Sequence, residues 1–170
     1  MRFIMMAVSL ALFASPQPAR ADAIIGSWAI EDKHDPITGK PWVIAQVKSD
    51  TEHNMWMQAR CEGGIAILVF GVGGDGANFR IGEILQARLR IDDNTTLQTR
   101  GALEDVASGA IGTLLTKTLY EEMLGAKTMG VMLEREDGQQ WAFTLRLSKT
   151  RQALQSMLRA CPLASAPDSL

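Results

Sequence analysis

The stretch MGVMLEREDGQQWAFTLRL, residues 129–147, decides the expected fold, because it predicts two strands joined by a tight turn. From Gln140 to Leu147 apolar and more polar residues alternate, with the period of two that is typical of half-buried strands. The expected inward positions are Trp141, Phe143, Leu145 and Leu147. The Asp137-Gly138 pair between the two apolar runs favours a hairpin turn. The sequence therefore predicts an antiparallel hairpin here.

The same alternation recurs earlier in the chain. In Met55 to Cys61 one expected face carries Met55, Met57, Ala59 and Cys61. In Glu83 to Ile91 the expected inward positions are Leu85, Ala87, Leu89 and Ile91. Further strand candidates are Trp42 to Val47, Ile65 to Phe70 and Met129 to Glu134. Six strand segments in one chain predict an antiparallel sheet or a sandwich.

Two segments have helical spacing instead. After Ser148, a candidate N-cap, apolar residues recur at helical intervals up to Cys161, and Pro162 ends the run. A second, shorter helix is predicted from Leu114 to Leu124, before Gly125. The expected class is α+β, mostly antiparallel and sandwich-like, with a C-terminal helix tied to the sheet.

The N-terminus is typical of a secretory signal peptide. Arg2 precedes an apolar run from Phe3 to Ala14, and Ala19-Arg20-Ala21 forms a cleavage site. The run is too short for a membrane span, which needs about 20 apolar residues. We expect a signal peptide over 1–21, one strand-rich domain over 22–162 and a flexible tail over 163–170. The processed protein would be periplasmic or secreted, without stable membrane insertion.

The charge balance argues against a nucleic-acid partner. Cleavage removes Arg2 and Arg20, which leaves 15 basic residues against 19 acidic ones. A nucleic-acid binder needs a basic surface instead. The local basic concentration consists of Arg80, Arg88, Arg90 and Arg100. Its simplest interpretation is a set of solvated strand positions.

Cys61 and Cys161 are the two cysteines of the chain. An even count in an exported protein predicts one disulfide, which would tie the middle of the chain to its end. A free catalytic thiol with His34 or His53 as base is the alternative. An oxidising compartment favours pairing of the two thiols.

The glycine-rich segment 71–76, GVGGDG, contains G-x-G-x-x-G after an apolar run, and Asp92 follows about 20 residues later. This pattern would suit a dinucleotide site. The alternative is a flexible connection between strands, which the strand-like alternation of Glu83 to Ile91 favours. Trp56 falls on the face opposite Cys61, and we predict a candidate binding surface formed by Trp56, Gly73, Gly74 and Asp75.

His34, Asp35 and His53 are the alternative site. With neighbouring acidic residues they would form a metal centre or a small hydrolase site on adjoining loops. Their spacing matches no established motif, and their polar contexts are typical of exposed loops. The sequence predicts no catalytic residues, no metal and no cofactor.

The order of these features resembles a known group of proteins. An early Trp28, a strand ending at Arg60-Cys61, the segment Arg90-Ile91-Asp92 and a closing strand that leads into a helix ending at Cys161 are similar to small periplasmic proteins of the invasion-associated locus B type. Accessory periplasmic proteins of type VI secretion are similar too. The resemblance spans residues 26 to 161.

The resemblance implies a β-sandwich-like, non-enzymatic domain with a Cys61–Cys161 disulfide. It also implies a role in envelope function, host interaction or secretion support, through a protein or envelope partner. We therefore expect an exported binding or accessory protein, and no catalytic residues are carried over.

Overall fold

The computed structural model describes residues 23–34, 37, 39, 41–51, 54–73, 79, 80, 82–94, 96–103 and 109–163. The predicted signal peptide and cleavage site lie outside these residues, as do Asp35, His53, Gly74, Asp75 and residues 164–170 of the predicted tail. The corresponding expectations stay predictions. Neither helix in the described part of the chain is long and apolar enough to cross a membrane.

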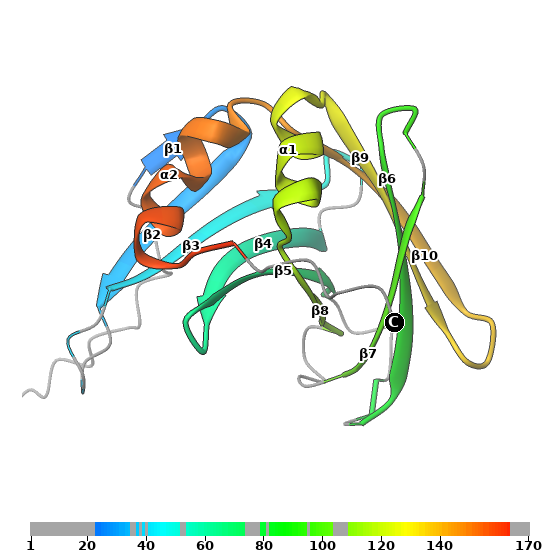
Figure 1. Ribbon diagram of the computed structural model, residues 1–170. Helices are drawn as coiled ribbons and strands as arrows, with labels where there is room; N and C mark the ends of the chain where they lie inside the picture. Colours follow the sequence, from blue (N-terminus) through cyan, green and yellow to red (C-terminus); the bar gives the residue numbers. More distant parts are fainter. Residues whose placement is uncertain are drawn as a thin grey trace, which may run out of the picture.

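Two antiparallel sheets make up most of the fold (Figure 1). The first sheet has the order β1-β2-β3-β4-β5-β8. Its strands are β1 (Ala23–Ile25), β2 (Trp28–His34), β3 (Pro41–Lys48), β4 (Met55–Glu62), β5 (Ile65–Val72) and β8 (Ile111–Leu114). The second sheet has the order β10-β9-β6-β7. Its strands are β6 (Ile84–Ile91), β7 (Leu97–Ala102), β9 (Thr128–Arg135) and β10 (Gln140–Arg146).

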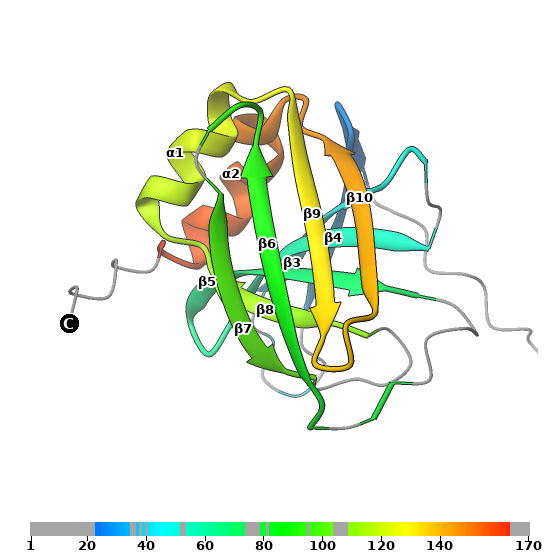
Figure 2. The same ribbon diagram turned by 90° about the vertical axis from the view of Figure 1, so that its right-hand side faces the viewer.

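The strands of the first sheet run across those of the second, and the helices α1 (Lys117–Gly125) and α2 (Thr150–Ala160) cover one end (Figure 2). The inner faces of both sheets and of α2 share a single core. In β6 the inward positions Leu85, Ala87, Leu89 and Ile91 are all buried, as the alternation predicts. The α+β class, dominated by antiparallel strands, is confirmed.

All six predicted strands are present, and the hairpin at Asp137-Gly138 joins β9 to β10. Gly138 has a positive φ of 88° and donates its N–H to the Arg135 carbonyl oxygen at 3.0 Å. Such a backbone conformation favours glycine, which explains why this pair is a reliable turn signal.

The second predicted helix begins later than expected. Leu114 ends β8, and Thr116 caps α1 by accepting the Leu119 N–H at 3.2 Å on its side-chain oxygen. A Thr hydroxyl satisfies one of the free N–H groups of a first helical turn, so the helix starts directly after this residue, at Lys117. The prediction of a helix from Leu114 is therefore wrong by three residues.

The C-terminal helix forms as predicted but with a different cap. Lys149, in the left-handed conformation, is the N-cap of α2 and provides no side-chain hydrogen bond. Ser148, the predicted cap, instead donates its N–H to the Ser27 side-chain oxygen at 3.1 Å. Ser27 in turn donates to the Arg146 carbonyl oxygen at 2.6 Å, so the start of β2 is fastened to the end of β10.

A disulfide joins Cys61 of β4 to Cys161 after α2, with 5.7 Å between the Cα atoms. Cys161 is fully buried, and so are Ala153, Leu154 and Met157 on the same face of α2. The helix therefore packs on β2, β3 and β4 with its apolar face. The predicted link between helix and sheet is confirmed.

The glycine-rich segment does not open a helix in the described residues. Gly71 lies inside β5, opposite Trp56 of β4, and residues 84–91 form strand β6. A dinucleotide fold needs a helix directly after the glycines. The strand at 84–91 instead supports the interpretation as a connection between strands.

A polar and aromatic cluster lies between the sheets at the end of β9. Arg135 points to the inner side, where its side chain pairs with Glu83. Its guanidinium lies 5.7 Å from the centre of the Phe79 ring, and Phe79 packs on Trp141 with 5.1 Å between ring centres. A charge on an inward strand position is tolerated because it has both an ionic and an aromatic partner.

Candidate functional site

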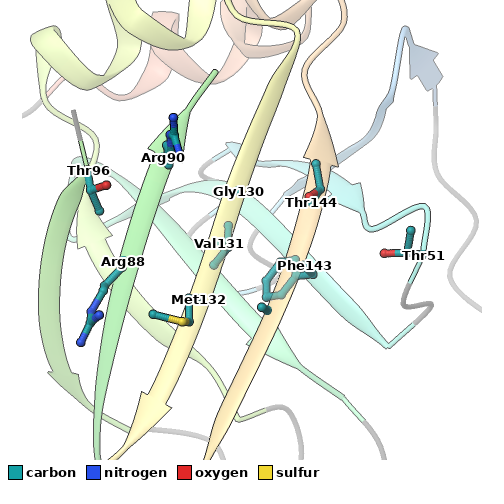
Figure 3. A pocket seen from close by; sticks show the side chains of 10 residues that line it. Thr51, Arg88, Arg90, Thr96, Gly130, Val131, Met132, Phe143 and Thr144 are labelled. Carbon is teal, nitrogen blue, oxygen red and sulfur yellow. The ribbon is translucent and has the colours of Figure 1, made fainter. Parts of the chain in front are cut away.

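A shallow depression of about 520 Å³ lies on the outer face of the second sheet, across β6, β9 and β10 (Figure 3). It is lined by Thr51, Arg88, Arg90, Thr96, Gly130, Val131, Met132, Ala142, Phe143 and Thr144. Figure 2 looks onto this face, with the helices to one side of it. We refer to the depression as the sheet trough.

Strand register creates the sheet trough. Gly130 of β9 lies between Arg90 of β6 and Thr144 of β10, so one row across the sheet has a small centre. In the next row Met132 lies between Arg88 and Ala142. Neighbouring strands are about 5 Å apart, so side chains in one row contact each other. Small residues on β9 and β10 beside long ones on β6 leave the hollow.

Gly130 leaves space in the sheet trough. Neither the backbone conformation nor a close neighbour requires glycine at this position. A Cβ atom at this position would meet nothing closer than the Arg90 carbonyl oxygen at 3.8 Å, an ordinary contact. The sheet would therefore accept a side chain here. The absence of a side chain at Gly130 leaves free space above β9.

The arginines of this face are already paired with acidic residues. Arg88 contacts Glu134 at 3.0 Å, Arg90 contacts Asp93 at 3.4 Å, and Arg146 contacts Asp50 at 2.6 Å. Exposed pairs of this kind contribute little to stability. Each guanidinium has five N–H donors, so donors remain for a ligand after one ion pair. The sheet trough thus offers directional hydrogen bonds with a largely compensated charge.

Asp92 fixes the end of β6 next to the sheet trough. Its carboxylate accepts the Thr128 N–H at 2.9 Å, the Lys127 N–H at 3.2 Å and the Thr128 hydroxyl at 3.0 Å. The backbone N–H groups of Thr128 and Lys127 hold the pKa of Asp92 below its ordinary value. The left-handed φ of 45° at Asp92 suits this turn. The clamp sets where β9 starts beside β6.

Replacing Asp92 with alanine is expected to lower the Tm at neutral pH, because the three donors lose their acceptor. A lowered pKa in the folded state stabilises the protein above the unfolded value near 3.8, and this contribution is lost as the pH falls through the lower folded value. The Tm difference between wild type and Asp92→Ala should therefore be constant near neutral pH and shrink below pH 3.8.

Thermal unfolding followed by circular dichroism from neutral to acidic pH measures this difference. Asp93→Ala is the matched control, because Asp93 is fully exposed and pairs with Arg90 at 3.4 Å. Equal Tm values for Asp92→Ala and Asp93→Ala at every pH would contradict the clamp.

The predicted binding surface lies elsewhere, along β4 and β5 of the first sheet. Trp56 is half-buried, and its ring covers Gly71 so closely that a Cβ atom there would overlap the indole. Gly73 donates its N–H to the Asn54 carbonyl oxygen at 2.6 Å. Gly74 and Asp75 are outside the described residues. A binding role for these four residues stays a prediction.

The alternative metal site is not tested. His34 ends β2, but its side chain, Asp35 and His53 lie outside the described residues. In the described part of the chain no group of three or more His, Cys, Asp or Glu residues is arranged to hold a metal ion.

Sequence reasoning missed the sheet trough. The sequence predicted Arg88 and Arg90 only as solvated strand positions. Ala142 falls between the predicted inward positions Trp141 and Phe143, so the same alternation places it on the outward face. The available signal was the occurrence of small residues, Gly130 and Ala142, at outward positions of two strands joined by one turn.

No protein-family model matches the chain, and no curated protein matches its sequence. Among solved structures, the crystal structure of invasion associated protein B from Bartonella henselae is similar. The TM-score is 0.61 at 12% sequence identity, over 81% of this chain and 94% of that chain.

The likeness is one of fold. It supports the first part of the resemblance inferred from the sequence, at the level of architecture. The likeness to accessory proteins of type VI secretion stays a prediction.

Proposed function

We propose that the chain is an exported, non-enzymatic binding or accessory protein that acts by docking a partner on the sheet trough. The observation that carries the proposal is the set of small residues in two neighbouring rows, Gly130, Thr144 and Ala142, which lie beside the long side chains of Arg88 and Arg90. An open hollow with directional donors suits recognition of a macromolecule. We infer that the partner is a protein of the envelope, of a host or of a secretion system.

Export is supported by two independent features. The N-terminal segment 1–21 has the composition of a signal peptide. The Cys61–Cys161 disulfide is typical of an oxidising compartment, such as the periplasm or the exterior. The fold likeness to invasion associated protein B is compatible with this location. We place the protein in the periplasm or among secreted proteins.

The position of β10 favours an extended segment of the partner. β10 is an edge strand of the second sheet, so one side of its backbone has no strand partner in that sheet. From Ala142 to Leu145 it lacks the charged residues and prolines that usually protect an edge strand. A partner segment would add beside β10 and place side chains in the sheet trough.

Photo-cross-linking in the native host tests the proposal. A photoreactive residue is placed at Thr144, inside the sheet trough, or at Gln140, on the same strand and face but outside it. We expect reproducible capture of one envelope, host or secretion protein from position 144 and a much weaker yield from position 140. Equal yields at both positions, or no capture at position 144, would reject the sheet trough as the docking site.

A further inference from the structure

A second hollow, separate from the sheet trough, lies between α1 and α2, which run side by side (Figure 1). Its volume is about 550 Å³. It is lined by Tyr120 of α1 and by Lys149, Arg151, Gln152, Gln155, Leu158 and Arg159 of α2 and its cap. We refer to it as the helix groove. The residues from α2 follow one stripe along the helix at intervals of three, four and seven positions.

The positive charges of the helix groove form no ion pair with the described acidic residues. In the part of the chain that the structure describes, Lys149, Arg151 and Arg159 form no ion pair, whereas Arg88, Arg90, Arg100 and Arg146 of the second sheet are all paired. The segment 148–163 contains no Asp or Glu. A concave surface whose lining carries three cations and no carboxylate attracts an anionic partner.

Two of these cations oppose the dipole of α2. Lys149 is the N-cap and Arg151 lies in the first turn, which contains no acidic residue. The N-terminus of a helix carries partial positive charge, so cations there are unfavourable and carboxylates favourable. Fold stability does not account for this placement. Binding of a negative group would account for it.

The floor of the helix groove is apolar. Tyr120 and Leu158 are half-buried and pack against the core, so each offers part of an apolar surface to a ligand. Gln152 and Gln155 are exposed and provide amide donors and acceptors for a peptide backbone. The lining therefore combines cations, an apolar contact and directional hydrogen bonds.

We propose that the helix groove binds an acidic protein segment that carries an apolar anchor residue. A membrane surface fits less well, because a membrane-bound helix needs a free apolar face. The apolar face of α2, with Ala153, Leu154 and Met157, is fully buried in the core. The proposal does not depend on the sheet trough, which lies on a different surface.

Fluorescence anisotropy with the processed chain and a fluorescein-labelled peptide, Glu-Glu-Leu-Glu-Glu, tests the proposal. We expect binding that weakens with added salt. The charge reversal Arg151→Glu with Arg159→Glu should weaken binding about tenfold or more. The control double variant, Lys48→Glu with Arg100→Glu, changes the net charge equally on other surfaces and should stay within about twofold of wild type.

Two further measurements separate the outcomes. The Tm of the Arg151→Glu and Arg159→Glu double variant should stay close to that of wild type, because Arg151→Glu improves the interaction with the helix dipole and Arg159→Glu, in the last turn, weakens it by a similar amount. An unchanged Tm shows that lost binding is not unfolding. Gln155→Trp, which fills the helix groove without changing charge, should weaken binding as well. Equal loss in both double variants, no binding of the peptide, or binding only to phosphatidylglycerol vesicles would overturn the proposal.

Discussion

Replacing both Cys61 and Cys161 with alanine is expected to lower the free energy of unfolding by about 2–5 kcal/mol. The two residues are separated by 100 positions, so the disulfide closes a long loop and restricts the unfolded chain strongly. It also holds α2 against β4, and Cys161 is fully buried in the core. The loss therefore combines a freer unfolded state with weaker packing of the helix.

Urea unfolding of residues 22–170, followed by circular dichroism, measures this change. Reduced wild-type protein should unfold close to the double variant, and the double variant should not respond to a reductant. An unchanged urea midpoint in the double variant would contradict the role assigned to the disulfide.

Trp28→Ala is expected to be comparably destabilising, by about 3–5 kcal/mol. Trp28 is 0% exposed at the start of β2 and is among the largest side chains in the core. Truncation would leave a cavity that the surrounding strands cannot fill. The indole N–H has no hydrogen-bond partner within the described structure. Trp28→Phe removes this unpaired donor and removes less side-chain volume than Trp28→Ala does. It should lower the free energy of unfolding by roughly half as much as Trp28→Ala, or less.

The same urea experiment measures both variants. Trp42→Ala is the control, because Trp42 is 44% exposed, and it should stay within about 1 kcal/mol of wild type. A loss in Trp28→Phe as large as that in Trp28→Ala would mean that the indole N–H is paired after all.

The strands that were predictable carry strong alternation. β6 and β10 each place at least three large apolar residues on one face, so their period of two is recognisable from the sequence alone. β2 and β7 were missed because their sequences, WAIEDKH and LQTRGA, are rich in charged and polar residues. β8 has four residues, and its last residue begins the helical spacing that continues into α1. Sheet pairing, rather than local pattern, makes these segments strands.

Small outward residues hint at a hollow, but which residues line the sheet trough together was not predictable from the sequence, for a related reason. Arg90 and Gly130 are far apart in sequence and become neighbours through the β6–β9 register. That register is fixed by long-range contacts such as the Asp92 clamp on Thr128. Periodicity tells which residues point outward on one strand. It does not tell which rows form across strands.

Trp56 illustrates the opposite case. Its outward position was predicted, but its packing on Gly71 depends on the pairing of β4 with β5. A flat ring over a glycine stabilises a sheet locally, so part of its surface is not free for a ligand. The structure therefore gives Trp56 a packing role in addition to the predicted one.

The most direct test of the central claim compares two tryptophan substitutions on β10. Ala142→Trp fills the sheet trough, whereas Gln140→Trp adds the same side chain on the same face outside it. The yield of the partner cross-linked from position 144 in the native host is measured in each background. The account predicts that Ala142→Trp abolishes capture and that Gln140→Trp leaves it near the unsubstituted level. Capture that persists in Ala142→Trp would contradict docking on the sheet trough.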